Sequence, residues 1–324
     1  MRASLRQLTS PRQVVKVAAP LMVSVAAIAY LGHTIDFAGV MQRMTLHAAA
    51  ILVPAILAFC AVSLFIESMS LVRLAPPAIR DDFHIGTAAR IKAASYLLSL
   101  IHYALGAGTL SLLLRRRARI GFADAAGMVI LIMMFDLGMV LLLVAVGVSL
   151  IATGAPELQF GMVLVVIAIL VTGLAALRLP ISLGPLDRIR DLELFRAART
   201  TPPRLLLELA FLRLTFVMSF ELMGWAALTA FGVMVPFGAL LVNFSLVALA
   251  GTLPAVAGIG PSQVGMVEFF RNYGDRESLL ASSIALSAGL IVFRAAIGML
   301  FAREFTREAL SASQSAPLGA EEDA

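Results

Sequence analysis

The chain has few charged residues and a single cysteine. Aspartate, glutamate, lysine and arginine make up 14% of the 324 residues, whereas soluble domains average about 25%. Hydrophobic residues make up 60%, more than a water-soluble core of this size can bury. Cys60 lies in an apolar run, which excludes a disulfide or a cysteine zinc site within one chain and favours a small core residue. The net charge of +5 is scattered over short loops, so it does not indicate nucleic-acid binding.

Long apolar runs take the place of charge, and their lengths predict an all-α polytopic membrane protein. About 20 residues cross about 30 Å of hydrocarbon. The first run follows several basic residues and can be read as a signal peptide, but it continues to Leu31 and favours an uncleaved span. The expected segments are Val17–Leu31, Leu46–Val72, Ile91–Leu114, Ala123–Ile151, Phe160–Leu177, Leu205–Phe231, Phe237–Tyr273 and Ser278–Ala302.

The basic residues set the expected orientation. The loops on both sides of Ile91–Leu114 are basic, so a full crossing would place one of them outside. We therefore interpret this segment as re-entrant, with Gly106 and Gly108 forming its turn; a full span with a glycine packing motif is the alternative. Phe237–Tyr273 is interpreted as a second dip, from the opposite side. The prediction is six full spans plus two re-entrant hairpins, with both termini cytoplasmic.

This topology divides the chain into two halves of opposite orientation. Residues 1–151 form the first repeat and residues 160–302 the second, and the glycine pairs that break the two dips lie 152 positions apart. Interrupted hydrophobic segments at matching places in two halves are typical of inverted-repeat transporters. An amphipathic segment at 184–199 is expected along the inner interface, and residues 303–324 are expected to form a disordered cytoplasmic tail.

Ionisable residues within the apolar segments mark a candidate pathway, because charge is expensive in lipid. We hypothesise that Asp136 and Arg294, on equivalent spans, meet near the pseudo-two-fold axis and that Arg294 binds a lipid phosphate. A structural ion pair is the alternative. Arg213 lies nine residues past Arg204, a distance at which snorkelling to the cytoplasmic side is strained, whereas Glu221 lies deeper and is the stronger functional candidate.

The second dip contains a recognisable helix start. Pro261 and Ser262 are predicted to open a short helix, whose free backbone N–H groups favour an anion; a structural turn is the alternative. No cofactor or metal is expected. The candidate substrate-binding residues are Arg294, Asp136, Glu221, Gly106, Gly108, Gly258, Gly260, Ser262 and Gln263.

Several of these features together resemble a known family. Arg73 closes the second span, a glycine-broken segment precedes Arg115–Arg119, Asp136 lies in the next span, and Pro254–Gln263 is rich in glycine. The arrangement, over residues 14–303, resembles the membrane region of lysylphosphatidylglycerol synthases and of flippase-like integral membrane proteins. Family members often carry P-x-x-x-G-x-G-x-x-E, and here Gln263 stands in the place of the glutamate. The resemblance implies lipid translocation without an attached synthase domain.

We therefore expect a lipid flippase, not an enzyme, in a bacterial inner membrane. Its partner would be an anionic, aminoacylated, hopanoid-like or polyprenyl lipid, with a partner synthase possible and no nucleic acid. No G-x-x-x-x-G-K-[ST] loop is present, so transport would run downhill or use an ion gradient. The alternatives are an enzyme of lipid-linked glycan or lipid modification, using Arg80-Asp81-Asp82 to hold a metal, and a non-transporting scaffold.

Overall fold

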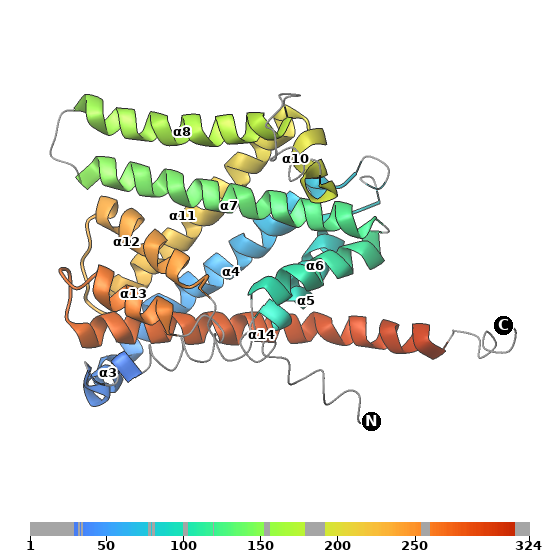
Figure 1. Ribbon diagram of the computed structural model, residues 1–324. Helices are drawn as coiled ribbons and strands as arrows, with labels where there is room; N and C mark the ends of the chain where they lie inside the picture. The colour runs from blue at the N-terminus through green and yellow to red at the C-terminus, as the bar shows by residue number, and fades with distance from the viewer. Residues whose placement is uncertain are drawn as a thin grey trace, which may run out of the picture.

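The computed structural model describes residues 29–31, 33, 35–76, 79, 82–99, 103–118, 120–151, 156–178, 192–253 and 260–314. All regular secondary structure within these ranges is helical (Figure 1). The all-α prediction is therefore confirmed for the described part of the chain. The segments Val17–Leu31 and Arg80-Asp81 fall largely or wholly outside it, as do Pro254 and Gly258.

Long apolar helices dominate the fold. Among the described residues, four helices are long and apolar enough to cross a membrane, which makes the chain a multi-pass membrane protein. They include α4 (Leu46–Leu74), α7 (Phe122–Ile151) and most of α8 (Pro156–Arg178). The fourth is the first part of α14 (Arg276–Gln314). A further long helix, α11 (Pro203–Ala230), has 28 residues and a length of about 42 Å, and it packs along α4.

Two pairs of shorter helices complete the bundle. The first pair is α5 (Ile85–Ser99) and α6 (Tyr103–Ala118), which pack against each other, and the second is α12 (Phe237–Ala250) and α13 (Pro261–Phe269). These helices are about 14 to 24 Å long, less than the hydrocarbon thickness. Figure 1 shows the α5–α6 pair in one half of the bundle and the α12–α13 pair in the other.

The turn of the first hairpin differs from the prediction. Gly106 and Gly108 lie inside α6, which begins at Tyr103, whereas α5 ends at Ser99. A Cβ at Gly106 would lie 2.5 Å from Cβ of Ser99, whereas one at Gly108 would meet nothing within 4 Å. Gly106 thus lets α6 approach α5, because a larger residue would force the two helices apart.

The prediction for the second dip is confirmed at its helix start. α13 begins at Pro261, as expected from the proline at the first helical position. Gly260 precedes it with a φ of +113°, a backbone conformation that residues with a Cβ atom rarely adopt.

Two predicted peripheral segments need correction. Residues 303–314, expected to be disordered, continue α14 as helix to Gln314. The described part of the 184–199 segment is not one continuous amphipathic helix: it comprises a 3-10 turn, η3 (Glu193–Phe195), and part of α10 (Arg196–Thr200). Both pack on α7, where the carbonyl of Leu194 lies against Gly127.

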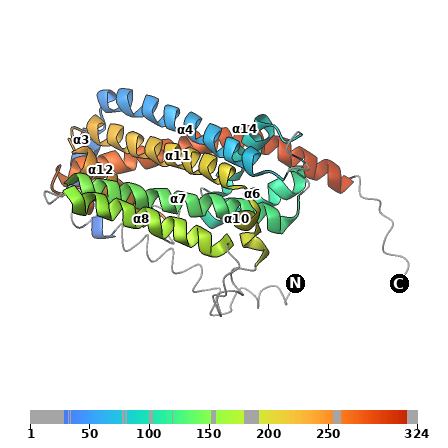
Figure 2. The same ribbon diagram turned by 90° about the horizontal axis from the view of Figure 1, so that it is seen from above.

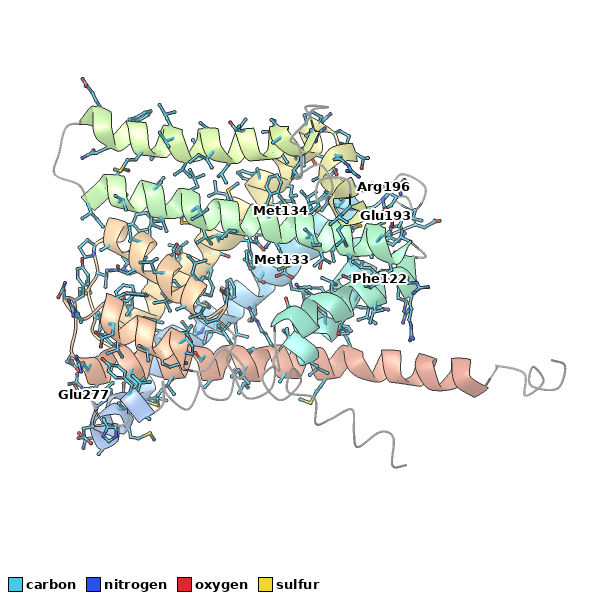
Figure 3. The ribbon with its side chains drawn as sticks, in the orientation of Figure 1. Phe122, Met133, Met134, Glu193, Arg196 and Glu277 are labelled. Carbon is cyan, nitrogen blue, oxygen red and sulfur yellow. The ribbon has the colours of Figure 1, made fainter. Side chains whose placement is uncertain are left out.

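Charged side chains gather at the two ends of the bundle. At one end, α3 (Phe37–Arg43) packs on α14, and Arg43 pairs with Asp275 at 3.3 Å. At the other end, Arg196 pairs with Asp124 at 3.6 Å. Figure 3 shows Arg196 and Glu277 at opposite ends, with the apolar length of the helices between them. The distribution fits a bundle whose ends face two aqueous sides.

Candidate functional site

Five helices bring ionisable side chains together inside the bundle. The group, here called the central charge cluster, has one member on each of α4, α5, α7, α11 and α14. Lys92 lies within electrostatic reach of Arg213, Arg294 and Asp136. Figure 2 shows α4, α7, α11 and α14 extending along the length of the bundle when it is seen from above. The members of the central charge cluster are Glu67, Lys92, Asp136, Arg213 and Arg294.

Arg213 is the centre of this cluster. Its side chain has no exposed surface, and its Nε donates a hydrogen bond of 2.7 Å to Oδ1 of Asp136. The guanidinium also lies 4.3 Å from the ring centroid of Phe216, one turn along the same helix. A buried guanidinium held by a carboxylate and an aromatic face is fixed in orientation, because both contacts depend on the plane of the fork.

The outer nitrogens of Arg213 make no such contact. Nη1 and Nη2 are buried, and the described residues offer neither of them a hydrogen-bond partner. Buried polar groups in proteins are nearly always hydrogen-bonded, so each exception calls for a physical reason. Arg213 thus has two charged donor groups inside the bundle that no described residue accepts from.

A second ion pair lies beside the first. Lys92 pairs with Glu67, which ties α5 to α4. Tyr96, one turn further along α5, lies between two cations: Nζ of Lys92 and Cζ of Arg294 are each 5.6 Å from its ring centroid. The cations of three helices therefore face one region.

The pairing predicted for Asp136 was wrong. Asp136 forms its ion pair with Arg213 rather than with Arg294, because α7 packs directly on α11. Arg213 does not snorkel towards an aqueous end; it points inward. Lys92, which is not among the site residues predicted from the sequence, lies inside α5. A carboxylate and an arginine at interior positions are visible in the sequence, but the partner depends on which helices are neighbours.

Glu221 forms a separate polar contact two turns further along α11. It is fully buried, and its Oε1 accepts a hydrogen bond of 2.8 Å from the hydroxyl of Ser245 on α12. The described residues give its Oε2 no partner. Glu221 thus ties α11 to the second pair of short helices and is not part of the central charge cluster.

Gln263 closes the start of α13. Its Oε1 accepts hydrogen bonds from the backbone N–H of Gly260 at 2.6 Å and from the hydroxyl of Ser262 at 3.1 Å. Its Nε2 donates to Ser287 on α14 at 3.1 Å. The Gln263 side chain thus satisfies the Gly260 N–H at this helix start, which leaves less for the anion expected there. Gly258 lies outside the described residues.

Aromatic rings lie between the central charge cluster and Glu221. Phe59 on α4 is 6.0 Å from Phe216 and 5.6 Å from Phe220, and Phe220 is 5.0 Å from Phe244 on α12, between ring centroids. Phe216 contacts Arg213, while Phe220 precedes Glu221 in the chain. These four rings, here called the aromatic layer, pack into the largest apolar core of the protein.

A groove of about 900 Å³ lies elsewhere, between α7 and α8. Its walls are apolar side chains apart from Glu157, and it contains no member of the central charge cluster. In the part of the chain that the structure covers, no group of three or more histidine, cysteine or acidic residues is placed to hold a metal ion.

Comparison with known proteins adds no family assignment. No protein-family model matches the chain, and no curated protein matches it significantly. The functional argument therefore depends on the residues themselves.

Proposed function

We propose that this protein is a lipid transporter of the flippase type, which moves an anionic or modified lipid between the two leaflets of a membrane. The observation that carries the proposal is the central charge cluster, which lies inside an otherwise apolar bundle. Intramembrane ionisable residues are expensive, and they typically line substrate or ion pathways.

The helix arrangement supports transport over a purely structural role. We interpret α5–α6 and α12–α13 as re-entrant hairpins, because each of these helices is shorter than the hydrocarbon core and the pairs lie in opposite halves of the bundle. With the long helices, they form the inverted repeat of residues 1–151 and 160–302. Substrate sites of such transporters lie where interrupted helices of the two repeats meet near mid-membrane.

The resemblance to the membrane region of lysylphosphatidylglycerol synthases points to the same class of substrate. The interpreted topology and the basic loops support cytoplasmic termini, and the prevalence of alanine and arginine favours a bacterial inner membrane. An anionic headgroup suits the cluster, because its cations outnumber its carboxylates.

Transport is tested by reconstitution. The purified protein is placed in vesicles of phosphatidylcholine and phosphatidylglycerol that carry a trace of fluorescent, headgroup-matched phosphatidylglycerol, with and without a pH gradient. External dithionite bleaches only the outer leaflet, so translocation appears as loss of the protected inner-leaflet signal. We expect this loss with the wild-type protein and not with Asp136→Asn/Arg213→Gln.

The matched control is Arg204→Gln. This residue lies on the same helix as Arg213, but 90% of its side chain is exposed, so its removal should leave translocation unchanged. If wild-type vesicles protect as much probe as protein-free vesicles under both conditions, the transport proposal is rejected.

A further inference from the structure

We infer that Arg213, together with Lys92 and Arg294, forms a phosphate-binding site inside the bundle. The inference rests on the proposed function, since it names the headgroup chemistry that a transported lipid would present there. The phosphate is either the diester of a phospholipid or a free inorganic phosphate, and the experiment below separates these two sources.

The first argument is that Arg213 has two hydrogen-bond donor groups that it does not use. Only Nε is used by Asp136, while Nη1 and Nη2 are buried with no partner among the described residues. The guanidinium has donors only and stays charged, so its natural missing partner is an anion with two oxygens. Phosphate oxygens match the fork of the guanidinium through two parallel hydrogen bonds.

The second argument is charge. The cluster has three cations, Lys92, Arg213 and Arg294, and two carboxylates, each of which already faces one cation. Within the described residues no ion pair joins Arg294 to a carboxylate, and its guanidinium lies 5.6 Å from the ring centroid of Tyr96. One anion therefore completes the charge balance of the cluster, which a low-dielectric surrounding strongly favours.

The third argument is access. Arg213 itself is enclosed, yet 20% of the Lys92 side chain and 23% of the Asp136 side chain are exposed. The side chains of Lys92 and Asp136, on α5 and α7, thus retain some surface that is not covered by the described residues. A headgroup that arrived by this route would contact Lys92 and Asp136, and Asp136 is hydrogen-bonded to the guanidinium of Arg213.

The expected binding is specific for phosphate rather than for acyl chains. The probes are dihexanoyl-phosphatidylglycerol, dihexanoylglycerol, which lacks the phosphate, and inorganic phosphate. Each is titrated calorimetrically into the intact protein in a neutral detergent. We expect dihexanoyl-phosphatidylglycerol to bind and dihexanoylglycerol not to bind.

Arg213→Lys is the decisive variant. Lysine keeps the positive charge opposite Asp136 but lacks the second arm of the fork, so affinity should fall at least about tenfold. Arg204→Lys is the matched control, because it makes the same substitution on the exposed surface of α11 and should bind as the wild type does. Unfolding followed through the single tryptophan, Trp225, checks that each variant is folded.

Where Arg213→Lys fails to fold, Asp136→Asn/Arg213→Gln replaces it, because that variant removes both charges of the pair together. The same loss of phosphate binding is expected. Equal affinity of the wild type and both Arg213 variants would overturn the inference. It would also be overturned if neither dihexanoyl-phosphatidylglycerol nor inorganic phosphate bound to the wild type.

The two proposals fail differently. Arg213-dependent binding of inorganic phosphate alone would keep the site and make its ligand a free anion, at the expense of lipid transport. Arg213-dependent binding of the phospholipid without translocation in vesicles would likewise keep the site and reject transport. Translocation that persists in Arg213→Lys, with unchanged affinity, would keep transport and reject the site.

Discussion

The ion pair between Arg213 and Asp136 should behave as a buried pair rather than a surface one, and a double-mutant cycle tests this directly. The perturbations are Asp136→Asn, Arg213→Gln and the two together. Arg213 has no exposed surface and lies 2.7 Å from its partner. Removal of Asp136 would leave an enclosed guanidinium with no carboxylate.

The magnitudes follow from this burial. Loss of one partner of a buried pair costs about 3–5 kcal/mol, because the other charge stays buried without compensation. Asp136→Asn should lie in that range. Arg213→Gln should lie at its lower end, since the remaining carboxylate is 23% exposed. The double variant removes both charges, so its free energy of unfolding should fall by no more than about 2 kcal/mol.

The assay is denaturant unfolding in mixed micelles, followed through Trp225 on the same helix. The expected coupling energy, the sum of the two single losses minus the double loss, is at least about 4 kcal/mol. The control cycle uses Arg73 and Glu208, which lie 3.7 Å apart with side chains 52% and 33% exposed, and it should give no more than about 1 kcal/mol. A coupling at the Arg213 pair below about 0.5 kcal/mol would refute the reasoning.

Three further predictions concern the hairpins and the charged end of the bundle. Gly106→Ala should destabilise the protein by about 1–3 kcal/mol in the same unfolding assay, because its Cβ would meet the other arm of the hairpin, while Gly108→Ala should be neutral or stabilising. Gln263→Ala should cost about 1–3 kcal/mol, because it removes the bond to the α13 start and leaves buried donors unpaired; equal stability would show that this cap is dispensable. Burial alone would raise the pKa of Asp275, but hydrogen bonds from the next helix start and the charge of Arg43 hold that pKa below its ordinary value. Its contribution is therefore complete above the unfolded-state pKa of about 4 and is lost as the pH falls through the lower folded-state pKa, so the stability difference between wild type and Asp275→Asn should shrink below about pH 4; a constant difference would contradict this.

The helices of this fold are readable from sequence because apolar length and helix starts are local properties. The apolar runs at Leu46–Val72 and Ala123–Ile151 correspond to α4 and α7 within two residues at each end. The start of α13 at Pro261 was predictable for the same reason, since a proline at the first helical position removes an N–H that would be unpaired anyway.

The turn of the first hairpin and the end of α14 were not readable in this way. Glycine is compatible with both a turn and a close helix contact, and only the position of Ser99 shows that Gly106 serves the contact. Residues 303–314 are polar, which favours disorder, yet they extend a helix whose earlier turns are already formed. Helix propagation costs much less than nucleation.

The site was readable as a set of residues but not as a set of partners. Asp136, Arg213, Glu221 and Arg294 are conspicuous because each interrupts an apolar run. Their contacts depend on packing between helices far apart in the chain, and no local pattern reports that α7 lies on α11. The distance of Arg213 from the start of α11 could have marked it as an interior site residue. Arg213 lies ten residues after Pro203, a rise of about 15 Å, which is too far for its side chain to snorkel easily to the aqueous end.

The polar side chains along α11 differ in charge from one part of the bundle interior to the next, so an anion is attracted to one part more than to the other. Arg213 and Glu221 are eight residues apart on this helix, a rise of about 12 Å, and the aromatic layer lies between them. A phosphate bound at Arg213 faces cations from α5 and α14, whereas beyond the rings it would meet a buried carboxyl group and the hydroxyl of Ser245. The cations gather around Arg213 and not around Glu221, so the region of Arg213 is the one that attracts an anionic headgroup. In the proposed transport, a headgroup that passed from Arg213 towards Glu221 would have to cross the aromatic layer, whose rings come from α4, α11 and α12.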